Sequence, residues 1–208
     1  KNEWLADTYL WLHAFVENEQ YIVFTLDNRG SENRGFAFES VIHRRLGEIE
    51  VKDQLKGVDY LKSLPYVDGN RIAVHGWSFG GFMASSLLTR HPEIFRTAVA
   101  GGAVTDWKYY EVMYGERYMD TPQENPEGYE NSRVGKYLTN LKRPLLFIHG
   151  SVDDVVVPQH MMSITRESIK KNDFIELFIY PMHAHGVRGT DHINLTERII
   201  DYVKKHNQ

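Results

Sequence analysis

The chain has 208 residues, of which 42% are hydrophobic, and a formal net charge of −4. This length and apolar content suit one substantial globular domain, and the acidic balance argues against a broad nucleic-acid-binding surface. No window approaches the roughly 20 apolar residues of a membrane-spanning helix, and no signal-peptide pattern opens the chain. Cysteine is absent, which excludes disulfides and a thiol nucleophile and leaves the compartment open between cytoplasm and periplasm.

Strand-type and helix-type patterns alternate from the start of the chain. The β-branched and aromatic run at 21–27 (YIVFTLD) predicts a first strand. Apolar residues at helical spacing then predict a helix over 44–64, which ends at Pro65. Residues 71–77 (RIAVHGW) predict a second strand and residues 79–91 a helix.

The second half of the chain continues this alternation. The expected elements are a strand over 95–102, short helices and loops over 105–143, a strand over 143–150, a helix over 158–171, a strand over 174–180 and a helix over 190–206. Thr190 or Asp191 is the expected N-cap of the last helix. The alternation predicts an α/β fold: one domain over 1–208 with a mostly parallel sheet and helices on both faces.

A serine lies between glycines where the strand over 71–77 meets the next helix. Gly76-Trp77-Ser78-Phe79-Gly80 has the form G-x-S-x-G in the strand–turn–helix setting of a nucleophile elbow. In such a turn the positions two before and two after the serine must lack bulk. The hydroxyl then projects above the sheet edge, and the Phe79 amide can face a developing oxyanion. The alternative is a glycine-rich turn with an incidental serine.

A nucleophilic serine needs a base, and the base needs a group that orients it. On this type of fold the chain order is serine, acid, histidine, with each residue in a loop after a strand. Asp153 and Asp154 follow the fourth expected strand, and His183 and His185 follow the fifth. The pattern is therefore met twice over, and one of the adjacent acids is expected to be only solvated or a helix cap.

Histidine clustering allows a second interpretation. His183, His185 and nearby His192 could ligate a metal, but no third ligand has convincing spacing, so no metal or other cofactor is expected. The remaining histidines are expected in packing or surface positions: His13, His43, His75, His91, His149, His160 and His206.

Several motifs occur together in a known order: DNRGS (27–31), RRLG (44–47), GWSFGG (76–81), HGSVDD (149–154) and HAHG (183–186). In these motifs the chain resembles the catalytic domain of the prolyl oligopeptidase family, in its dipeptidyl peptidase IV branch. The block at 109–129 is most similar to that of bacterial prolyl tripeptidyl aminopeptidases. The resemblance implies an α/β-hydrolase fold.

The resemblance also assigns roles. It selects Asp153 as the acid and His185 as the base, and makes Asp154 and His183 their neighbours. It implies a shallow proline pocket, a setting in which a rigid apolar ring loses little entropy. The implied pocket residues are Val104, Trp107, Tyr110, Tyr114 and Val156. The alternative for each of them is an ordinary place in the core.

Two positions concern the substrate's amino terminus. In the tripeptidyl relatives an acid matching Glu111 holds the free amine, whereas the alternative here is a solvated surface acid. Dipeptidyl peptidase IV has a substrate-binding asparagine where this chain has Val155. This departure favours the tripeptidyl interpretation.

Parts of the family pattern are not found in the sequence. The resemblance implies an upstream β-propeller, earlier strands of the sheet and a Gly-Gly-Pro loop whose tyrosine completes the oxyanion hole. We therefore expect a fragment truncated at its N-terminus. Because loss of one oxyanion donor typically costs roughly 10²–10³ in rate, the isolated chain is expected to be weak or inactive.

The predicted function is a serine exopeptidase that releases N-terminal di- or tripeptides after proline. Its expected partner is a peptide with proline at position two or three, with no nucleic acid, no membrane in this segment and a possible homodimer. Two alternatives remain. One is an esterase or acylaminoacyl peptidase on the same fold, and the other is a non-catalytic dimerisation module.

Overall fold

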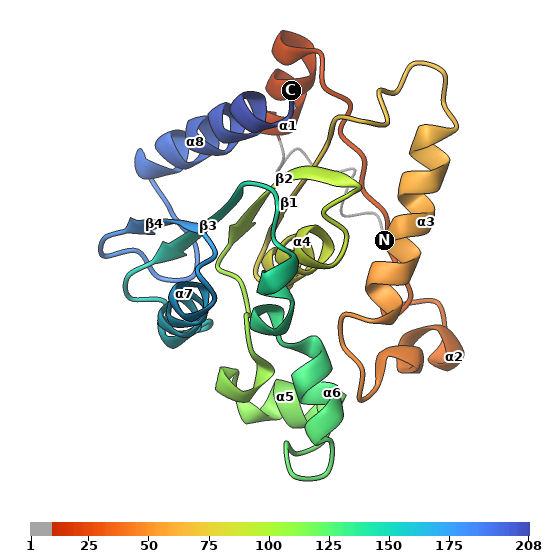
Figure 1. Ribbon diagram of the computed structural model, residues 1–208, viewed down its shortest axis with the longest axis vertical. Helices are drawn as coiled ribbons and strands as arrows, with labels where there is room; N and C mark the ends of the chain where they lie inside the picture. The colour runs from red at the N-terminus through yellow and green to blue at the C-terminus, as the bar shows by residue number, and fades with distance from the viewer. Residues whose placement is uncertain (1–9) are drawn as a thin grey trace.

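The computed structural model describes residues 10–208 and contains a parallel sheet flanked by helices (Figure 1). The four strands are hydrogen-bonded in chain order: β1 (Ile72–Trp77), β2 (Phe95–Gly101), β3 (Leu145–Gly150) and β4 (Glu176–Tyr180). All three pairings are parallel. The predicted α/β-hydrolase arrangement of sheet and helices is therefore confirmed.

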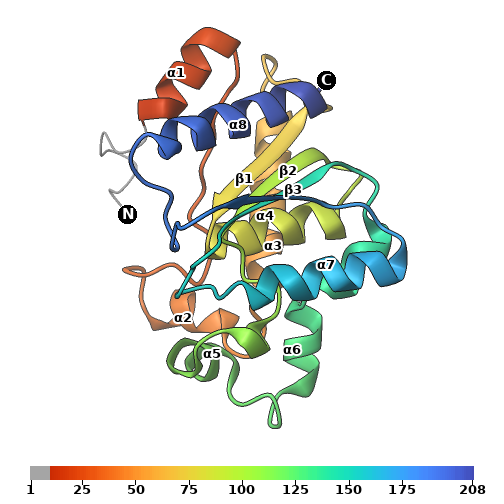
Figure 2. The same cartoon turned by 90° about the vertical axis from the view of Figure 1, so that its left-hand side faces the viewer.

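Longer helices cover both faces of the sheet: α1 (Leu10–Glu19), α3 (Ile49–Lys62), α4 (Phe79–Arg90), α7 (Gln159–Lys171) and α8 (Asp191–His206). Figure 2 shows α1 and α8 above the sheet and α3, α4 and α7 below it. Short helices fill the connections: α2 (Phe36–Glu39), η3 (Ser40–Ile42), η4 (Trp107–Tyr109), α5 (Val112–Met119), α6 (Pro126–Ser132) and η5 (Val134–Asn140). The mixed region at 105–143 thus has the expected short helices and loops.

Side chains alternate between the two faces because successive residues of a strand point to opposite sides. In β3, Leu145 and Phe147 belong to the core on the α4 side of the sheet, whereas Leu146 and Ile148 belong to the core on the α8 side. All four are at least 95% buried. The near-continuous apolar runs of these strands follow from burial on both faces.

The prediction of a strand over 21–27 is wrong. The segment forms no strand ladder with any residue in 10–208. Ile22 and Phe24 are 52% and 40% exposed, and the carbonyl of Leu26 accepts a hydrogen bond from the Gln54 side chain at 2.9 Å instead of from a neighbouring strand. The β-branched pattern favours an extended chain, but strand structure also requires a partner.

One helix boundary differs from expectation. The helix predicted over 44–64 begins at Ile49, because Arg44 and Gly47 take positive φ values of 66° and 82° that end any helical path before it. The last helix begins at Asp191 with Thr190 in the N-cap position, as expected, although the Thr190 side chain makes no capping hydrogen bond.

Within residues 10–208, no helix combines the length and apolar content needed to cross a membrane.

Candidate active site

The register of the sheet brings three loops to one edge. Trp77 lies beside Gly101 in the β1–β2 pairing, and Gly150 lies beside Tyr180 in the β3–β4 pairing. Because parallel strands end at the same edge, the loops after β1, β3 and β4 meet there. These loops carry the serine, the two aspartates and the two histidines that the sequence singled out.

Ser78 occupies a strained turn between β1 and α4. Its φ of 60° and ψ of −118° are unusual for a residue with a side chain. A Cβ at Gly76 would lie 2.3 Å from the carbonyl oxygen of Gly80, so only glycine fits two residues before the serine. A Cβ at Gly80 would meet nothing within 4 Å, so the expected crowding two residues after the serine is not found. It occurs instead at Gly81, whose Cβ would lie 2.4 Å from the carbonyl oxygen of Gly101.

The backbone around Ser78 is fixed on both sides. The Ser78 amide donates to the carbonyl of Gly101 at 2.8 Å, and the Ser78 carbonyl accepts from the amide of Phe82 at 3.0 Å. Phe79 is the first residue of α4, where amide N–H groups have no acceptor within the helix. The Phe79 amide can therefore donate to an anion above Ser78.

The two aspartates after β3 differ sharply. Asp153 is 3% exposed, and its Oδ1 accepts the amides of Val155 and Val156 at 2.9 and 2.8 Å. Asp154 is exposed. Burial alone would raise the pKa of Asp153, but hydrogen bonds from His185 and these amides outweigh it and hold the pKa below its ordinary value. Asp153 is therefore a buried, ionised carboxylate.

The two histidines after β4 also separate. Nδ1 of His185 lies 2.9 Å from Oδ2 of Asp153, whereas Nε2 of His183 pairs with Asp191 at 2.8 Å. The indole of Trp77, the neighbour of Ser78, donates to the carbonyl of His185 at 2.8 Å. Neither the Ser78 hydroxyl nor Nε2 of His185 hydrogen-bonds to another described residue. Both can therefore face a substrate or each other.

An aromatic cluster lies beside this rim. Trp107, 2% exposed, stacks on Tyr114 with ring centroids 5.5 Å apart and meets Tyr110 edge-on at 5.5 Å. Val104 and Val156 belong to the same buried core as Trp107. Tyr110 and Tyr114 are only partly buried, so one side of the cluster is open. The five residues expected in the proline pocket thus lie within or against one apolar cluster.

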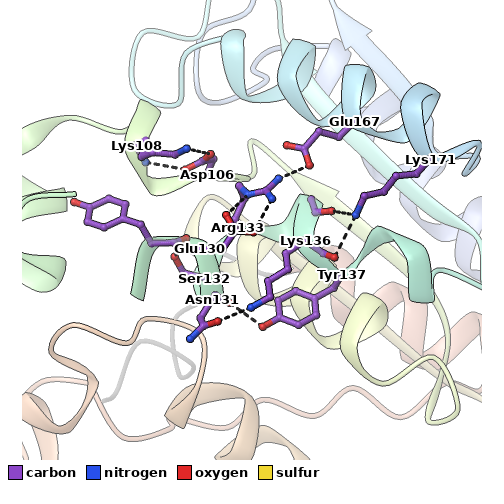
Figure 3. Close-up of polar contacts among 12 residues, drawn as sticks. Asp106, Lys108, Glu130, Asn131, Ser132, Arg133, Lys136, Tyr137, Glu167 and Lys171 are labelled. Carbon is purple, nitrogen blue, oxygen red and sulfur yellow. Dashed lines mark hydrogen bonds and ion pairs between the residues drawn. The ribbon is translucent and has the colours of Figure 1, made fainter. Parts of the chain in front are cut away.

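Polar contacts hold the loop that carries this cluster (Figure 3). Asp106 caps η4 by accepting the amide of Lys108 at 3.0 Å. Nearby, Arg133 forms ion pairs with Glu130 and Glu167, which join α6 to α7. The amide of Val134 then donates to the carbonyl of Thr105 at 3.0 Å. The loop next to Trp107 is therefore fastened to neighbouring helices.

The two positions expected near a substrate amine are both at the surface. Glu111 is exposed and caps α5, since its Oε2 accepts the amide of Met113 at 2.8 Å. Its other carboxylate oxygen makes no hydrogen bond to a described residue. Val155 is 44% exposed. Surface positions on the rim are compatible with substrate contact at both residues.

Sequence reasoning missed two residues that contact this constellation, Trp77 and His149. Trp77 binds the backbone of His185, as described above. His149 and His160, expected in packing or surface positions, are both fully buried; His149 lies beside the loop of Asp153, whereas His160 contacts Thr105. The sequence signal was the placement of His149 directly before the glycine of HGSVDD, which a packing interpretation does not explain.

Comparison with known proteins gives a consistent result. The model of the prolyl oligopeptidase family matches residues 7–208. Dipeptidyl peptidase 8 of Mus musculus is 37% identical over 173 residues, which make up 81% of this chain and 19% of that protein. Dipeptidyl peptidase 4 of Felis catus is 33% identical over 199 residues, or 94% of this chain and 26% of that protein.

Solved structures agree. A Bacteroides ovatus protein described as a dipeptidyl aminopeptidase IV has a TM-score of 0.85 and 54% identity, covering 86% of this chain and 26% of that one. Dipeptidyl peptidase 4 of Porphyromonas gingivalis has a TM-score of 0.82 and 32% identity over the same shares. The chain spans about a fifth to a quarter of the length of these relatives. The match across nearly all of its residues shows that the chain belongs to the prolyl oligopeptidase family.

Proposed function

We propose that this chain is the catalytic part of a serine exopeptidase that releases N-terminal di- or tripeptides after proline. The observation that carries the proposal is the bond between His185 and Oδ2 of Asp153, whose Oδ1 accepts two backbone amides, at the sheet edge where Ser78 is held in a strained turn. The names of the relatives support a peptidase of the dipeptidyl type.

The proposed chemistry is acyl transfer. The oxygen of Ser78 attacks the carbonyl carbon of the proline residue itself, and Nε2 of His185 takes the hydroxyl proton. The peptide bond between this carbonyl carbon and the nitrogen of the next residue then breaks. Asp153 keeps the imidazole oriented and stabilises its charged form, while the Phe79 amide donates to the oxyanion. The proton then passes from His185 to the leaving amine, and water hydrolyses the acyl-enzyme.

The aromatic cluster supports selection of proline. Tyr110 and Tyr114 are the partly exposed members of the cluster and pack against the buried Trp107, and a proline ring placed against them would lose little of its own freedom. Glu111, with one carboxylate oxygen unused by α5, is proposed to bind the substrate ammonium. A carboxylate at this position would determine how many residues fit between the amine and the cleaved bond.

Chromogenic substrates test the proposal. Hydrolysis of Xaa-Pro, Xaa-Xaa-Pro and acyl-amino-acid derivatives is compared on the 208-residue chain and on any longer polypeptide in which it occurs. The proposal expects preference for a free amine and a proline next to the cleaved bond. Preference for acyl-amino-acid or simple ester substrates would replace it with the esterase or acylaminoacyl-peptidase alternative. Light scattering measures whether the chain forms the predicted homodimer.

A further inference from the structure

Two imidazoles outside the candidate triad are completely buried. His149, near the end of β3, and His160, in α7, both have 0% exposure. Nε2 of His149 lies 2.7 Å from the carbonyl oxygen of Val156 and 3.5 Å from Oδ2 of Asp153. Because a carbonyl oxygen can only accept, Nε2 of His149 must carry the proton.

With this donor, both backbone polar groups of Val156 are hydrogen-bonded to side chains. The Val156 amide donates to Oδ1 of Asp153 at 2.8 Å, and the Val156 carbonyl accepts from His149. Asp153 and His149 therefore hold the two peptide groups of one residue that is itself 0% exposed. The attachment also fixes the carboxylate, since Oδ1 faces the amides while Oδ2 faces His185 and His149.

The chemistry explains why histidine suits this position. Burial lowers the pKa of His149, so the ring donates as a neutral group and adds no positive charge beside the carboxylate. Lysine or arginine would instead compete with His185 for Asp153. The arrangement has a cost, because Nδ1 of His149 is buried and has no hydrogen-bond partner among the described residues.

We infer that His149 is a positioning residue: its Nε2–H holds the carbonyl of Val156, whose amide binds the carboxylate of Asp153, in the wall of the candidate proline pocket. The imidazole thus acts on the acid that aligns His185 through Val156, and it fixes the backbone that would bound the substrate ring. The inference rests on the proposed function for its catalytic consequence, but the hydrogen bonds themselves do not depend on it.

Nitrogen NMR of the 208-residue chain with ¹⁵N-labelled histidine tests the hydrogen bonds without any need for activity. The expected signal for His149 at neutral pH is a neutral ring with Nε2 protonated and Nδ1 unprotonated. The His149→Phe spectrum identifies the resonance by its loss. A ring protonated at Nδ1, or a cationic ring at neutral pH, would overturn the inference even if the peptidase proposal stood.

Reactivity of Ser78 tests the coupling. The rate of covalent labelling by a fluorophosphonate should fall about 10–100-fold in His149→Phe, because small displacements of catalytic groups are costly. His149→Gln should recover most of the rate, since its side-chain amide can donate where Nε2 does. His160→Phe, which removes a buried imidazole bonded to Thr105 instead, should lose less.

These outcomes separate the two proposals. Equal labelling of wild type and His149→Phe would contradict the positioning role, as would equal losses in the Phe and Gln variants. Circular dichroism checks that each variant folds. If His149→Phe does not fold, the spectrum of His149→Gln identifies the His149 resonance, and its tautomer decides alone. If a longer polypeptide that contains this chain resists labelling while the chain shows the expected tautomer, the result would count against the proposed function and leave the hydrogen-bonding role intact.

Discussion

Two segments of this molecule have similar apolar, strand-like sequences, but only one of them forms a strand. Residues 145–150 (LLFIHG) form β3, paired on both sides and buried along their whole length. Residues 21–27 (YIVFTLD) form no strand and no ladder with any described residue, and four of their apolar side chains are 37% to 52% exposed. The difference shows that an apolar, β-branched run makes a strand only where neighbouring strands supply its hydrogen bonds.

The comparison matters for the site because every candidate catalytic residue follows a paired strand. Ser78 follows β1, Asp153 follows β3 and His185 follows β4. Their backbones are fixed by ladders or by buried hydrogen bonds, whereas the segment at 21–27 lacks such ties. Substitutions in and directly after the paired strands should therefore have large effects on activity or stability, and substitutions in residues 21–27 should have small ones.

The largest effect is expected from Asp153→Asn. The isosteric amide cannot hold the same imidazole tautomer, so the turnover of a proline-containing substrate should fall by roughly 10⁴-fold. Asp154→Asn is the matched control, because Asp154 is exposed and the change should leave the rate nearly unaltered. Steady-state kinetics measures both, and a larger loss in the Asp154 variant would reverse the assignment of the acid.

A paired glycine substitution tests the turn at Ser78. Gly76→Ala places a methyl group 2.3 Å from the Gly80 carbonyl oxygen, so it should lower the free energy of unfolding by about 3 kcal/mol or more. Gly80→Ala points into open space within α4 and should be neutral or stabilising by up to about 1 kcal/mol. Denaturant titration decides, and equal stability of the two variants would show that the turn is not constrained as described.

Stability should depend on pH through a buried acid in the core. Glu50 is 0% exposed, and burial raises its pKa from an ordinary 4.5 to about 7. The folded state thus keeps a proton that the unfolded state releases. The free energy of unfolding should therefore decrease as pH rises from about 4.5 to 7, by a total of about 3 kcal/mol from this group.

Glu50→Gln isolates this contribution. The variant has no proton to lose at this position, so unfolding curves measured from pH 5 to 8 should show a weaker decline than those of the wild type. Parallel pH dependence in the two proteins would mean that Glu50 is ionised in the fold with a pKa near its ordinary value.

The smallest effect on stability should come from a substitution in residues 21–27. Ile22→Thr replaces a side chain that is 52% exposed and should change the free energy of unfolding by no more than about 0.5 kcal/mol. Ile148→Thr, the same change at a residue with 0% exposure, should cost about 3 kcal/mol. Thermal unfolding compares them, and a loss for Ile22→Thr as large as that for Ile148→Thr would show that the half-exposed Ile22 side chain contributes as much as a core residue.

Local patterns in the sequence were sufficient for much of this molecule. The strands at 71–77, 95–102, 143–150 and 174–180 are found close to their expected ranges, and the corner at Ser78 has its expected strand and helix. The patterns could not tell Asp153 from Asp154 or His183 from His185, because burial and hydrogen bonding separate residues that the chain places side by side. Only the family resemblance distinguished them in advance.

Contacts between residues far apart in the chain could not be predicted from the sequence. The bond from Trp77 to the backbone of His185 joins residues that are 108 positions apart, and no local pattern indicates it. The role of the buried His149 likewise depends on the return of the chain at Val156. The strand expected at 21–27 failed for the same reason, since its pairing depends on strands elsewhere.

The most direct test of the central claim is to map fluorophosphonate labelling by peptide mass spectrometry in wild type and His185→Ala. The account predicts a phosphonyl group on Ser78 in the wild type, with loss of fluoride, and a strongly reduced rate in the variant, because His185 must accept the hydroxyl proton. Labelling at another serine, or a Ser78 rate unaffected by His185→Ala, would contradict it. Absence of labelling even in a longer polypeptide that contains this chain would favour a non-catalytic module.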